Sequence, residues 1–284
     1  MSEAIDTCEL PDLQNKDDDR GVHIDKVGIR KFKAPIKVKA RDGESQATIG
    51  DFSIYTSLSE EVRGANMSRY IQTIMKAVDN NVFALDVMEE ILQVLKEKLE
   101  STDSYLKIRF PFYIMQKAPV TDNYTPMFYD CTLEAFDKDG VVEKYLTVEV
   151  LASSLCPCSK GMSQVEPGNE TDSTIPGFGA HNQRAIVRVK VHMTGFVWVE
   201  DLVKIAEDCS SCPTYGILKR SDEKFVTEHA YHNPKFVEDM GRDAALKLAD
   251  LEGVDGYVVV AESEESIHQH NAVAIVRGGE HYIQ

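Results

Sequence analysis

LKIRFPFYI, residues Leu106 to Ile114, places an apolar side chain at every second position. This period of two predicts a β-strand with one buried face. The segment before it, Val82 to Leu99, has apolar residues at helical spacing, with acids and lysines on the opposite face. A helix of this kind next to a half-buried strand favours a sheet that is covered by helices on one side.

Outward from this strand, the same order of elements is predicted twice. In the first half, strands at 23–30, 36–40 and 47–58 precede helices at 66–78 and 82–99, and strands follow at 106–114 and 127–136. In the second half, strands at 141–151 and 184–193 precede helices at 199–208 and 234–251, and strands follow at 255–261 and 271–277. The order predicts an α+β fold with antiparallel sheets and paired helices on one face. We expect a flexible N-terminal arm over 1–22 and two tandem modules over 23–140 and 141–284.

The charge and cysteine content exclude several classes of protein. The chain of 284 residues has 47 acidic and 31 basic residues, a formal net charge of −16. Nucleic-acid and anionic-membrane surfaces are basic, so we expect neither partner. Residues 1–20 lack the charged and apolar regions of a secretion signal, and no apolar run approaches the ~20 residues that span a bilayer. Six cysteines in a chain of this length suit a reducing compartment, and we expect a cytoplasmic protein.

The segment SSLCPCSK, residues 153–160, brings two thiols and an amine to the end of a predicted strand. A thiolate is a strong ligand for a borderline divalent metal. An equally good interpretation of Cys156 and Cys158 is two small buried hydrophobes. Cys209 and Cys212 have the spacing of a zinc-ligand pair, but no second pair of that spacing exists, which favours structural cysteines.

Four further segments carry polar side chains that could form a site. GAHNQR (179–184) surrounds His181 with polar neighbours that a core would not tolerate without partners, which favours a site. LKRSDEK (218–224), taken alone, favours a charged surface turn. Glu238 lies on the first turns of the helix predicted at 234–251, where acids often only complement the helix dipole. His268 and His270 lie beside acids in ESEESIHQH (262–270), a composition typical of metal sites and of acidic loops alike. Together these segments supply enough ligands for one hydrolytic divalent metal.

Several blocks of this sequence resemble, in the same order, the signature blocks of the type IB GTP cyclohydrolase family. They are PDLQNKDDDRGVHIDKVGI, EEVRGANMSRY, SSLCPCSK, GAHNQR, LKRSDEKFVT, NPKFVED and ESIHQHNA. The resemblance covers nearly the whole chain. It implies two tandem tunnelling-fold modules, GTP as the substrate, and a homodimer or homotetramer with its active sites at subunit contacts.

The resemblance also implies roles for individual residues. The metal ligands would be Cys156, His181, Glu223 and His268, and Cys156 would be catalytically important as well. Glu238 matches the acid that holds a purine or pterin by its ring N–H groups. Apart from the resemblance, a chain of net charge −16 needs a local basic patch to bind a triphosphate, and we expect Lys219 and Arg220, with Arg184 or Lys160, to form it. The ligand types suit Fe²⁺, Zn²⁺ or Mn²⁺, and we expect Fe²⁺.

The chain departs from the bacterial pattern between CPC and GAHNQR, which are almost adjacent in bacterial members of the family. Here residues 161–178 intervene, as in the archaeal branch that serves methanopterin biosynthesis. We therefore expect formate and 7,8-dihydroneopterin 2′,3′-cyclic phosphate as products. The alternative is the folate-pathway enzyme, which releases 7,8-dihydroneopterin triphosphate.

Two interpretations from other classes of protein stay open. A structural-metal binding module would use a closed tetrathiolate of Cys156, Cys158, Cys209 and Cys212. A pterin-binding tunnelling-fold protein without hydrolytic activity would need Glu238 but no metal.

Overall fold

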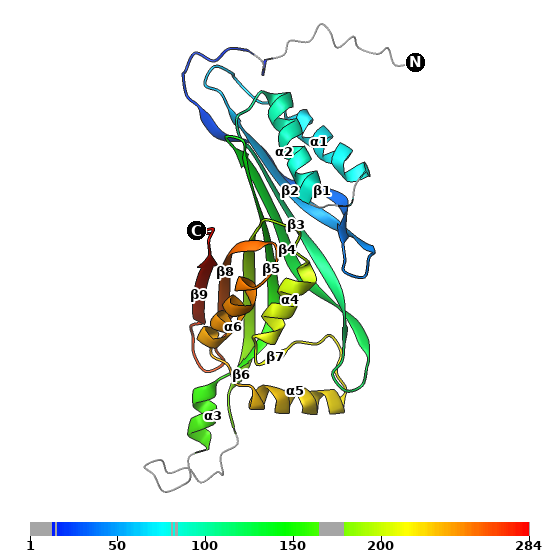
Figure 1. The fold of residues 1–284 in the computed structure, drawn as a ribbon, viewed down its shortest axis with the longest axis vertical. Coiled ribbons are helices and arrows are strands. Elements are labelled where there is room, and N and C mark those ends of the chain that lie inside the picture. Colours follow the sequence, from blue (N-terminus) through cyan, green and yellow to red (C-terminus); the bar gives the residue numbers. More distant parts are fainter. Residues whose placement is uncertain (1–12, 15, 81, 83–84, 165–178, 284) are drawn as a thin grey trace. The chain divides into compact units, whose positions relative to one another are not determined.

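The computed structural model describes residues 13–14, 16–80, 82, 85–164 and 179–283 (Figure 1). Neighbouring strands follow the order β1-β2-β3-β4-β5-β6-β8-β9, and β7 pairs with β5. The strands are β1 (Ile24–Lys39), β2 (Ser45–Leu58), β3 (Ser104–Lys117), β4 (Tyr124–Lys138), β5 (Val141–Leu155), β6 (Asn182–Met193), β7 (Cys212–Pro213), β8 (Val254–Ser263) and β9 (Ala272–Gly279). The helices are α1 (Met67–Asn80), α2 (Leu85–Leu99), α3 (Pro157–Ser163), α4 (Val199–Asp208), α5 (Arg220–His232) and α6 (Val237–Ala249).

The chain divides into two compact units. The first contains residues 1–38, 49–108 and 134–143, and the second contains 39–48, 109–133 and 144–284. The modules predicted at 23–140 and 141–284 stay a prediction. Within the first unit, the backbone N–H of Asp18 donates to the Glu61 carbonyl (2.9 Å) and that of Arg63 donates to the Lys16 carbonyl (3.0 Å). Part of the predicted arm therefore lies hydrogen-bonded along residues 61–64.

Alternation along LKIRFPFYI is confirmed in strand β3. Leu106, Ile108, Phe110 and Phe112 are buried, while Arg109, Pro111 and Tyr113 between them are exposed. In the first unit, helices α1 and α2 pack together and bury one apolar face each, including Tyr70, Ile74, Met88, Leu92 and Leu95. The predicted helices 66–78 and 82–99 are thus present; residues 83 and 84 lie outside the described residues.

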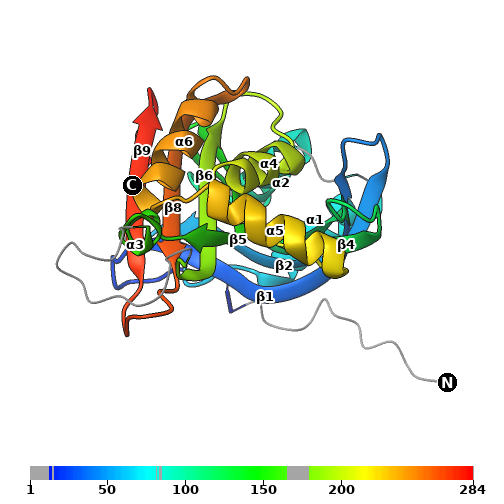
Figure 2. The ribbon, with the colours of Figure 1, turned by 90° about the horizontal axis from the view of Figure 1, so that it is seen from below.

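The second unit is built on β6, whose inward-facing side chains Ala185, Val187, Val189 and Val191 are completely buried. Helix α4 packs on β6 and β7, and α6 packs on β8 and β9, both on one face of the sheet (Figure 2). The α6 backbone approaches β9 at Gly241, where a Cβ atom would lie 2.9 Å from a methyl group of Val276. Antiparallel pairing of β5 with β6, β6 with β8 and β8 with β9 confirms the predicted packing.

Residues 218–224, taken alone, suggested a charged surface turn. In the structure, the residues from Arg220 onward belong to helix α5. Among its residues only Asp222 and Ala230 are buried, so the sequence carries no apolar stripe. The helix is stabilised at its start instead, because the buried Asp222 carboxylate accepts hydrogen bonds from the backbone N–H groups of Lys219, Val120 and Thr121, each at 2.9 Å. Burial raises the pKa of Asp222, but these bonds and one from the Thr121 hydroxyl outweigh it and lower the pKa to about 2.

The helix predicted at 234–251 begins later than expected, at Val237. Residues before it are held by the end of β5: the Lys235 N–H donates to the Leu155 carbonyl (3.1 Å), and the Ser154 hydroxyl donates to the Lys235 carbonyl (3.2 Å). These bonds keep residues 234–236 out of the helix. They also bring the start of α6 beside the end of β5.

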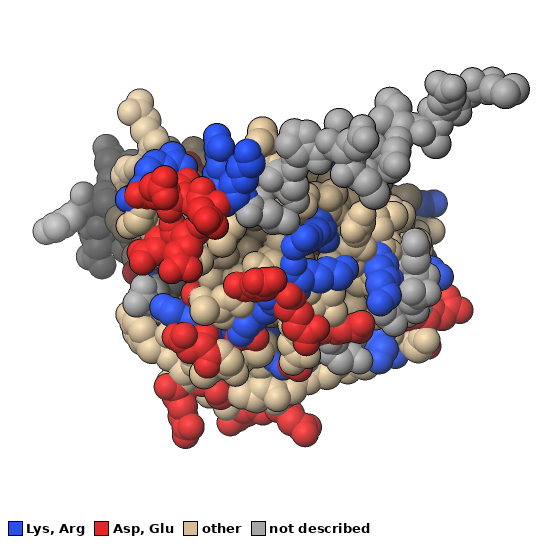
Figure 3. Space-filling view, turned by 90° about the horizontal axis from the view of Figure 1, so that it is seen from above, with Lys and Arg blue, Asp and Glu red and all other residues tan. Residues whose placement is uncertain are grey.

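On the face drawn in Figure 3, Lys and Arg side chains lie beside Asp and Glu side chains. Across the residues that the structure describes, no helix is both long enough and apolar enough to span a bilayer.

Candidate active site

Cys156 lies where β5 ends and α3 begins. Its backbone N–H donates to the His181 carbonyl (3.1 Å), which extends the β5–β6 ladder by one residue. The side chain is half-buried, and its Sγ accepts a hydrogen bond from the Ser159 N–H at 3.5 Å. The Ser159 hydroxyl in turn accepts from the His181 N–H (3.2 Å). The thiol and the imidazole are therefore carried by neighbouring, hydrogen-bonded backbone.

His181 begins a chain of polar contacts that runs toward the end of β8. Its Nδ1 lies 2.8 Å from Gln183 Oε1, and Gln183 Nε2 donates to Glu265 Oε1 at 3.3 Å. Glu265 Oε2 lies 4.0 Å from His181 Nδ1, so these two groups are not directly hydrogen-bonded. Gln183 and Glu265 were not singled out from the sequence. Their signal was the polar context of GAHNQR and the acids before His268.

A pocket of about 370 Å³ opens beside these residues. Its wall includes Cys156, Gln183, Lys235, Glu238 and Glu265. The volume is in the range of about 300–1,000 Å³ that is typical of small-molecule sites. The structure thus brings a thiol, a carboxylate on a helix N-terminus and the Gln183–Glu265 pair to one cavity.

Glu238 lies in the first turn of α6 and is exposed. It reaches the pocket because the segment before α6 is hydrogen-bonded to the end of β5, directly before Cys156. The Asp239 carboxylate, one residue on, accepts from the Phe236 N–H (3.0 Å) and so caps the helix. Glu238 is left to face the pocket, while Asp239 performs the capping.

Glu223 and His268 lie elsewhere in the single chain. Glu223 is exposed on the first turn of α5, and neither residue lines the pocket. His268 is exposed between β8 and β9, where its ring stacks on that of His270 at 5.0 Å between centroids. In the part of the chain that the structure describes, the four predicted ligands do not form one compact ligand group.

The cationic residues expected to meet phosphates differ in their availability. Lys219, Arg220 and Arg184 are exposed. Lys160, in contrast, donates from Nζ to the Tyr231 carbonyl (2.5 Å) and lies over the Tyr231 ring, 4.4 Å from its centroid. Its ammonium group therefore links α3 to the end of α5.

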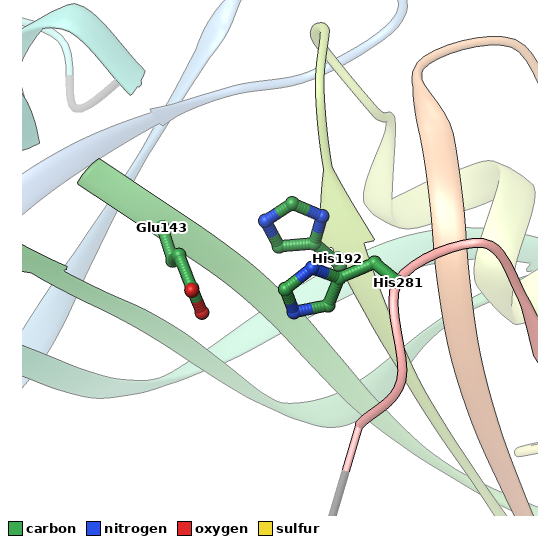
Figure 4. A group of neighbouring side chains, drawn as sticks. All are labelled: Glu143, His192 and His281. Carbon is green, nitrogen blue, oxygen red and sulfur yellow. The ribbon is translucent and has the colours of Figure 1, made fainter. Parts of the chain in front are cut away.

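A separate group of side chains could hold a metal: Glu143 on β5, His192 on β6 and His281 near the C-terminus (Figure 4). One ligand atom from each lies within 4.8 Å of the others. The two imidazoles stack at 3.8 Å, His192 Nδ1 is hydrogen-bonded to the Asp255 carboxylate, and His281 Nε2 lies 2.9 Å from the Tyr145 hydroxyl. The sequence did not reveal this group, because its members come from segments far apart and share no spacing.

A family model described as "Type I GTP cyclohydrolase folE2" matches residues 10–274 of the chain. The chain belongs to this family of GTP cyclohydrolases.

Three of its curated relatives are named GTP cyclohydrolase FolE2. The chain is 42% identical over 267 residues to the GTP cyclohydrolase FolE2 of Caldicellulosiruptor bescii, covering 94% of this chain and 98% of that protein. It is 42% identical over 272 residues to that of Geobacter sulfurreducens, covering 94% and 97%. It is 38% identical over 278 residues to that of Magnetococcus marinus, covering 97% and 99%. The chain is thus an enzyme of the GTP cyclohydrolase class. These names favour the folate-type alternative over the archaeal branch that the 161–178 insertion suggested.

Solved structures confirm the fold of this GTP cyclohydrolase. Uricase from Arthrobacter globiformis matches with a TM-score of 0.52 at 7% identity, covering 90% of this chain and 93% of that one. Urate oxidase from Bacillus sp. TB-90 matches with a TM-score of 0.50 at 9% identity, covering 90% and 100%. Identities this low show the fold alone, which is that of two tandem tunnelling-fold modules.

The remaining cysteine pair of the cyclohydrolase is buried. Burial raises the pKa of Cys209 to about 12 and that of Cys212 to about 11, so both are neutral thiols near pH 7. Cys212 packs against Leu155 and Ala230 in a small apolar cluster. The tetrathiolate alternative is wrong, since these cysteines form no ligand group with Cys156 and Cys158.

Proposed function

We propose that this GTP cyclohydrolase opens the imidazole ring of guanine in GTP, releases C8 as formate and forms 7,8-dihydroneopterin triphosphate. The observation that carries this proposal is that Cys156 and Glu238 line the same pocket. It agrees with the bacterial relatives named FolE2 at about 40% identity.

The donor types at and beside the pocket suit a divalent metal, although within one chain these side chains form no compact ligand group among the described residues. A half-buried thiol, an imidazole whose Nδ1 is already engaged, and a nearby carboxylate make a mixed sulfur, nitrogen and oxygen donor set. Such a set suits Fe²⁺, Zn²⁺ or Mn²⁺, and we propose Fe²⁺. We assign Cys156 and His181 of one subunit as ligands, and Glu223 and His268 of a neighbouring subunit. The bound ion supplies a water of lowered pKa, the source of a hydroxide-like nucleophile near neutral pH.

Glu238 selects guanine in this proposal. Its carboxylate accepts hydrogen bonds from the ring N1–H and from the exocyclic amine, which are charge-assisted and therefore strong. Adenine has an acceptor at N1, so it would place a lone pair against the carboxylate. The base is thereby held with its imidazole ring inside the pocket, toward Cys156 and His181.

Lys219, Arg220 and Arg184 bind the triphosphate. A chain of net charge −16 repels such a ligand overall, so a local group of cations has to offset that repulsion. After C8 leaves as formate, the ribose rearranges and closes onto the exposed amine to form the pterin ring. The phosphates leave with the product unchanged.

The test is anaerobic incubation of the purified protein with GTP and Fe²⁺, with parallel samples in Zn²⁺ and Mn²⁺. We expect formate and a fluorescent pterin in equal amounts, with three triphosphate signals in the ³¹P spectrum of the product. Full activity with Zn²⁺ in air would contradict Fe²⁺ as the metal. Absence of formate under every condition would contradict the activity.

The cyclic phosphate is the second candidate product, and the insertion at 161–178 favours it. Residues 165–178 lie outside the described residues. In the same ³¹P experiment, one cyclic phosphodiester signal in place of three would identify this product and replace the folate-type assignment.

A further inference from the structure

Gln183 lies between the imidazole of His181 and the carboxylate of Glu265. His181 and Gln183 are two residues apart in extended backbone, so their side chains point to the same face of the sheet. The Glu264 N–H donates to the Arg184 carbonyl (2.9 Å), which continues the β6–β8 pairing and brings Glu265 opposite Gln183. Both polar ends of the Gln183 amide are therefore used, one on each neighbour.

The orientation of the Gln183 amide follows from its neighbours. A carboxylate only accepts hydrogen bonds, so the Gln183 NH₂ group must face Glu265, and Nε2 lies 3.3 Å from Oε1. The Ser266 hydroxyl donates to the same Gln183 Oε1 at 3.4 Å. The amide oxygen is then the atom 2.8 Å from His181 Nδ1, and it needs a donor there. Nδ1 therefore carries the hydrogen of the neutral imidazole.

We propose that Gln183 is a positioning residue that fixes the tautomer of His181, with the hydrogen on Nδ1 and the lone pair on Nε2. This inference rests on the proposed function, in which His181 is a metal ligand. Glu265 cannot do the same directly, because its nearer oxygen is 4.0 Å from Nδ1. A hydrogen-bonded second nitrogen fixes the ring and raises the basicity of the ligating nitrogen.

Two substitutions of Gln183 distinguish its hydrogen bond to His181 from its hydrogen bond to Glu265. Gln183→Met keeps the length of the side chain and removes both hydrogen bonds. Gln183→Glu keeps an acceptor for His181 Nδ1–H and loses the donor toward Glu265. The matched control is Asn182→Leu, since Asn182 is the exposed neighbour on the opposite face of the strand.

The first readout is the tautomer of His181 in the metal-free protein. It is measured by two-bond ¹⁵N–¹H spectra at about pH 8.5, two units above the ordinary histidine pKa. We expect the Nδ1–H form in the wild type, in Gln183→Glu and in Asn182→Leu. In Gln183→Met the population shifts toward Nε2–H, the form that free imidazole side chains prefer.

The second readout is the affinity for Zn²⁺, measured by competition with a chelator. We expect about a 10- to 100-fold loss in Gln183→Met, the usual effect of removing such a partner. Gln183→Glu should stay within a few-fold of the wild type. Thermal melting of each variant shows whether it is folded.

Three results would overturn the inference: an unchanged tautomer in folded Gln183→Met, an unchanged Zn²⁺ affinity in that variant, or an equal loss in Asn182→Leu. Failure of the proposed function is distinguishable, because the wild type itself would then release no formate from GTP. The tautomer measurement needs neither metal nor substrate.

Discussion

At the scale of single residues, Cys156 and Glu238 line the same pocket but have different proposed roles, metal binding and guanine binding. Cys156 is held by backbone hydrogen bonds at the junction of β5 and α3, and Glu238 faces the same cavity from the start of α6. A thiol there suits a metal, and a carboxylate suits the N–H edge of guanine. Substitution of Cys156 and substitution of Glu238 should therefore impair different properties of the enzyme.

Cys156→Ala should lose both the bound metal and formate release, because the substitution removes a proposed ligand. Metal content by mass spectrometry and formate by coupled assay measure the two losses. Cys158→Ala is the matched control, since Cys158 is an exposed thiol two residues away and should keep both properties. Full metal content with normal turnover in Cys156→Ala would refute the assignment.

Glu238→Gln should raise KM for GTP and leave the metal content unchanged. Loss of charge-assisted hydrogen bonds costs about 1.5–3 kcal/mol, which corresponds to roughly a 10- to 100-fold weaker interaction. Steady-state kinetics checks this, with the exposed Glu252→Gln as the control. If the metal is lost instead, Glu238 and Glu223 have been assigned each other's roles.

At the scale of elements, the spacing of apolar residues predicted the strands and helices that bury a continuous apolar face. It did not predict helix α5, whose start depends on hydrogen bonds to a single polar residue. Strand β3 and helix α2 follow their apolar patterns, since each buries one continuous face. Helix α5 buries only Asp222 and Ala230, and its start depends on hydrogen bonds to Val120 and Thr121, about a hundred residues away in the sequence. Hydrogen bonds to residues so far away in the sequence cannot be predicted from the spacing of apolar residues within the helix.

The same limit applies to the candidate site. Cys156, His181 and Glu238 could be named because their sequence blocks resemble a known family. The Gln183–Glu265 contact depends on the register of β6 against β8, and the stacking of His192 on His281 depends on where the chain ends pack. Neither can be derived from composition or spacing.

Helix α4 carries a partly buried acid, Glu207, that makes stability depend on pH. Burial raises the pKa of Glu207 above its ordinary value of 4.5, although a hydrogen bond from the Tyr129 hydroxyl (2.9 Å) acts in the opposite direction. The folded state thus binds this proton more tightly than the unfolded state. Its contribution to stability is present at low pH and is lost as pH rises through the raised pKa.

Glu207→Gln should therefore be more stable than the wild type at about pH 8, and the advantage should shrink toward about pH 4.5. Urea unfolding midpoints at a series of pH values measure this. The exposed Glu97→Gln serves as the control and should show no such trend. An advantage that grows as the pH falls would contradict the stated direction.

At the scale of the whole molecule, the separation of Glu223 and His268 from the Cys156 pocket bears on assembly. In one chain these side chains lie outside the pocket, and the resemblance to the family places sites at subunit contacts. Homo-oligomers with closed symmetry bring such surfaces together. A homodimer or homotetramer that completes the site stays a prediction.

Mixing two inactive variants tests it. If Cys156 and Glu223 of one site come from different subunits, co-refolded Cys156→Ala and Glu223→Gln chains should regain up to about a quarter of wild-type activity, since random pairing leaves that share of contacts intact. Cys156→Ala mixed with His181→Ala is the control, because both defects fall on the same side of the contact. No recovery in the first mixture would place Glu223 and Cys156 in one subunit's site.

Two hydrogen bonds join the chain near the start of the insertion to the chain near its end. The Cys156 N–H donates to the His181 carbonyl, and the Ser163 hydroxyl donates to the Gly179 carbonyl. The insertion therefore starts and ends at neighbouring, hydrogen-bonded positions of the backbone. Evolution could lengthen or trim it without shifting the register of the thiol against the imidazole. The length of the insert and the spacing of the two proposed metal ligands can therefore change independently of each other.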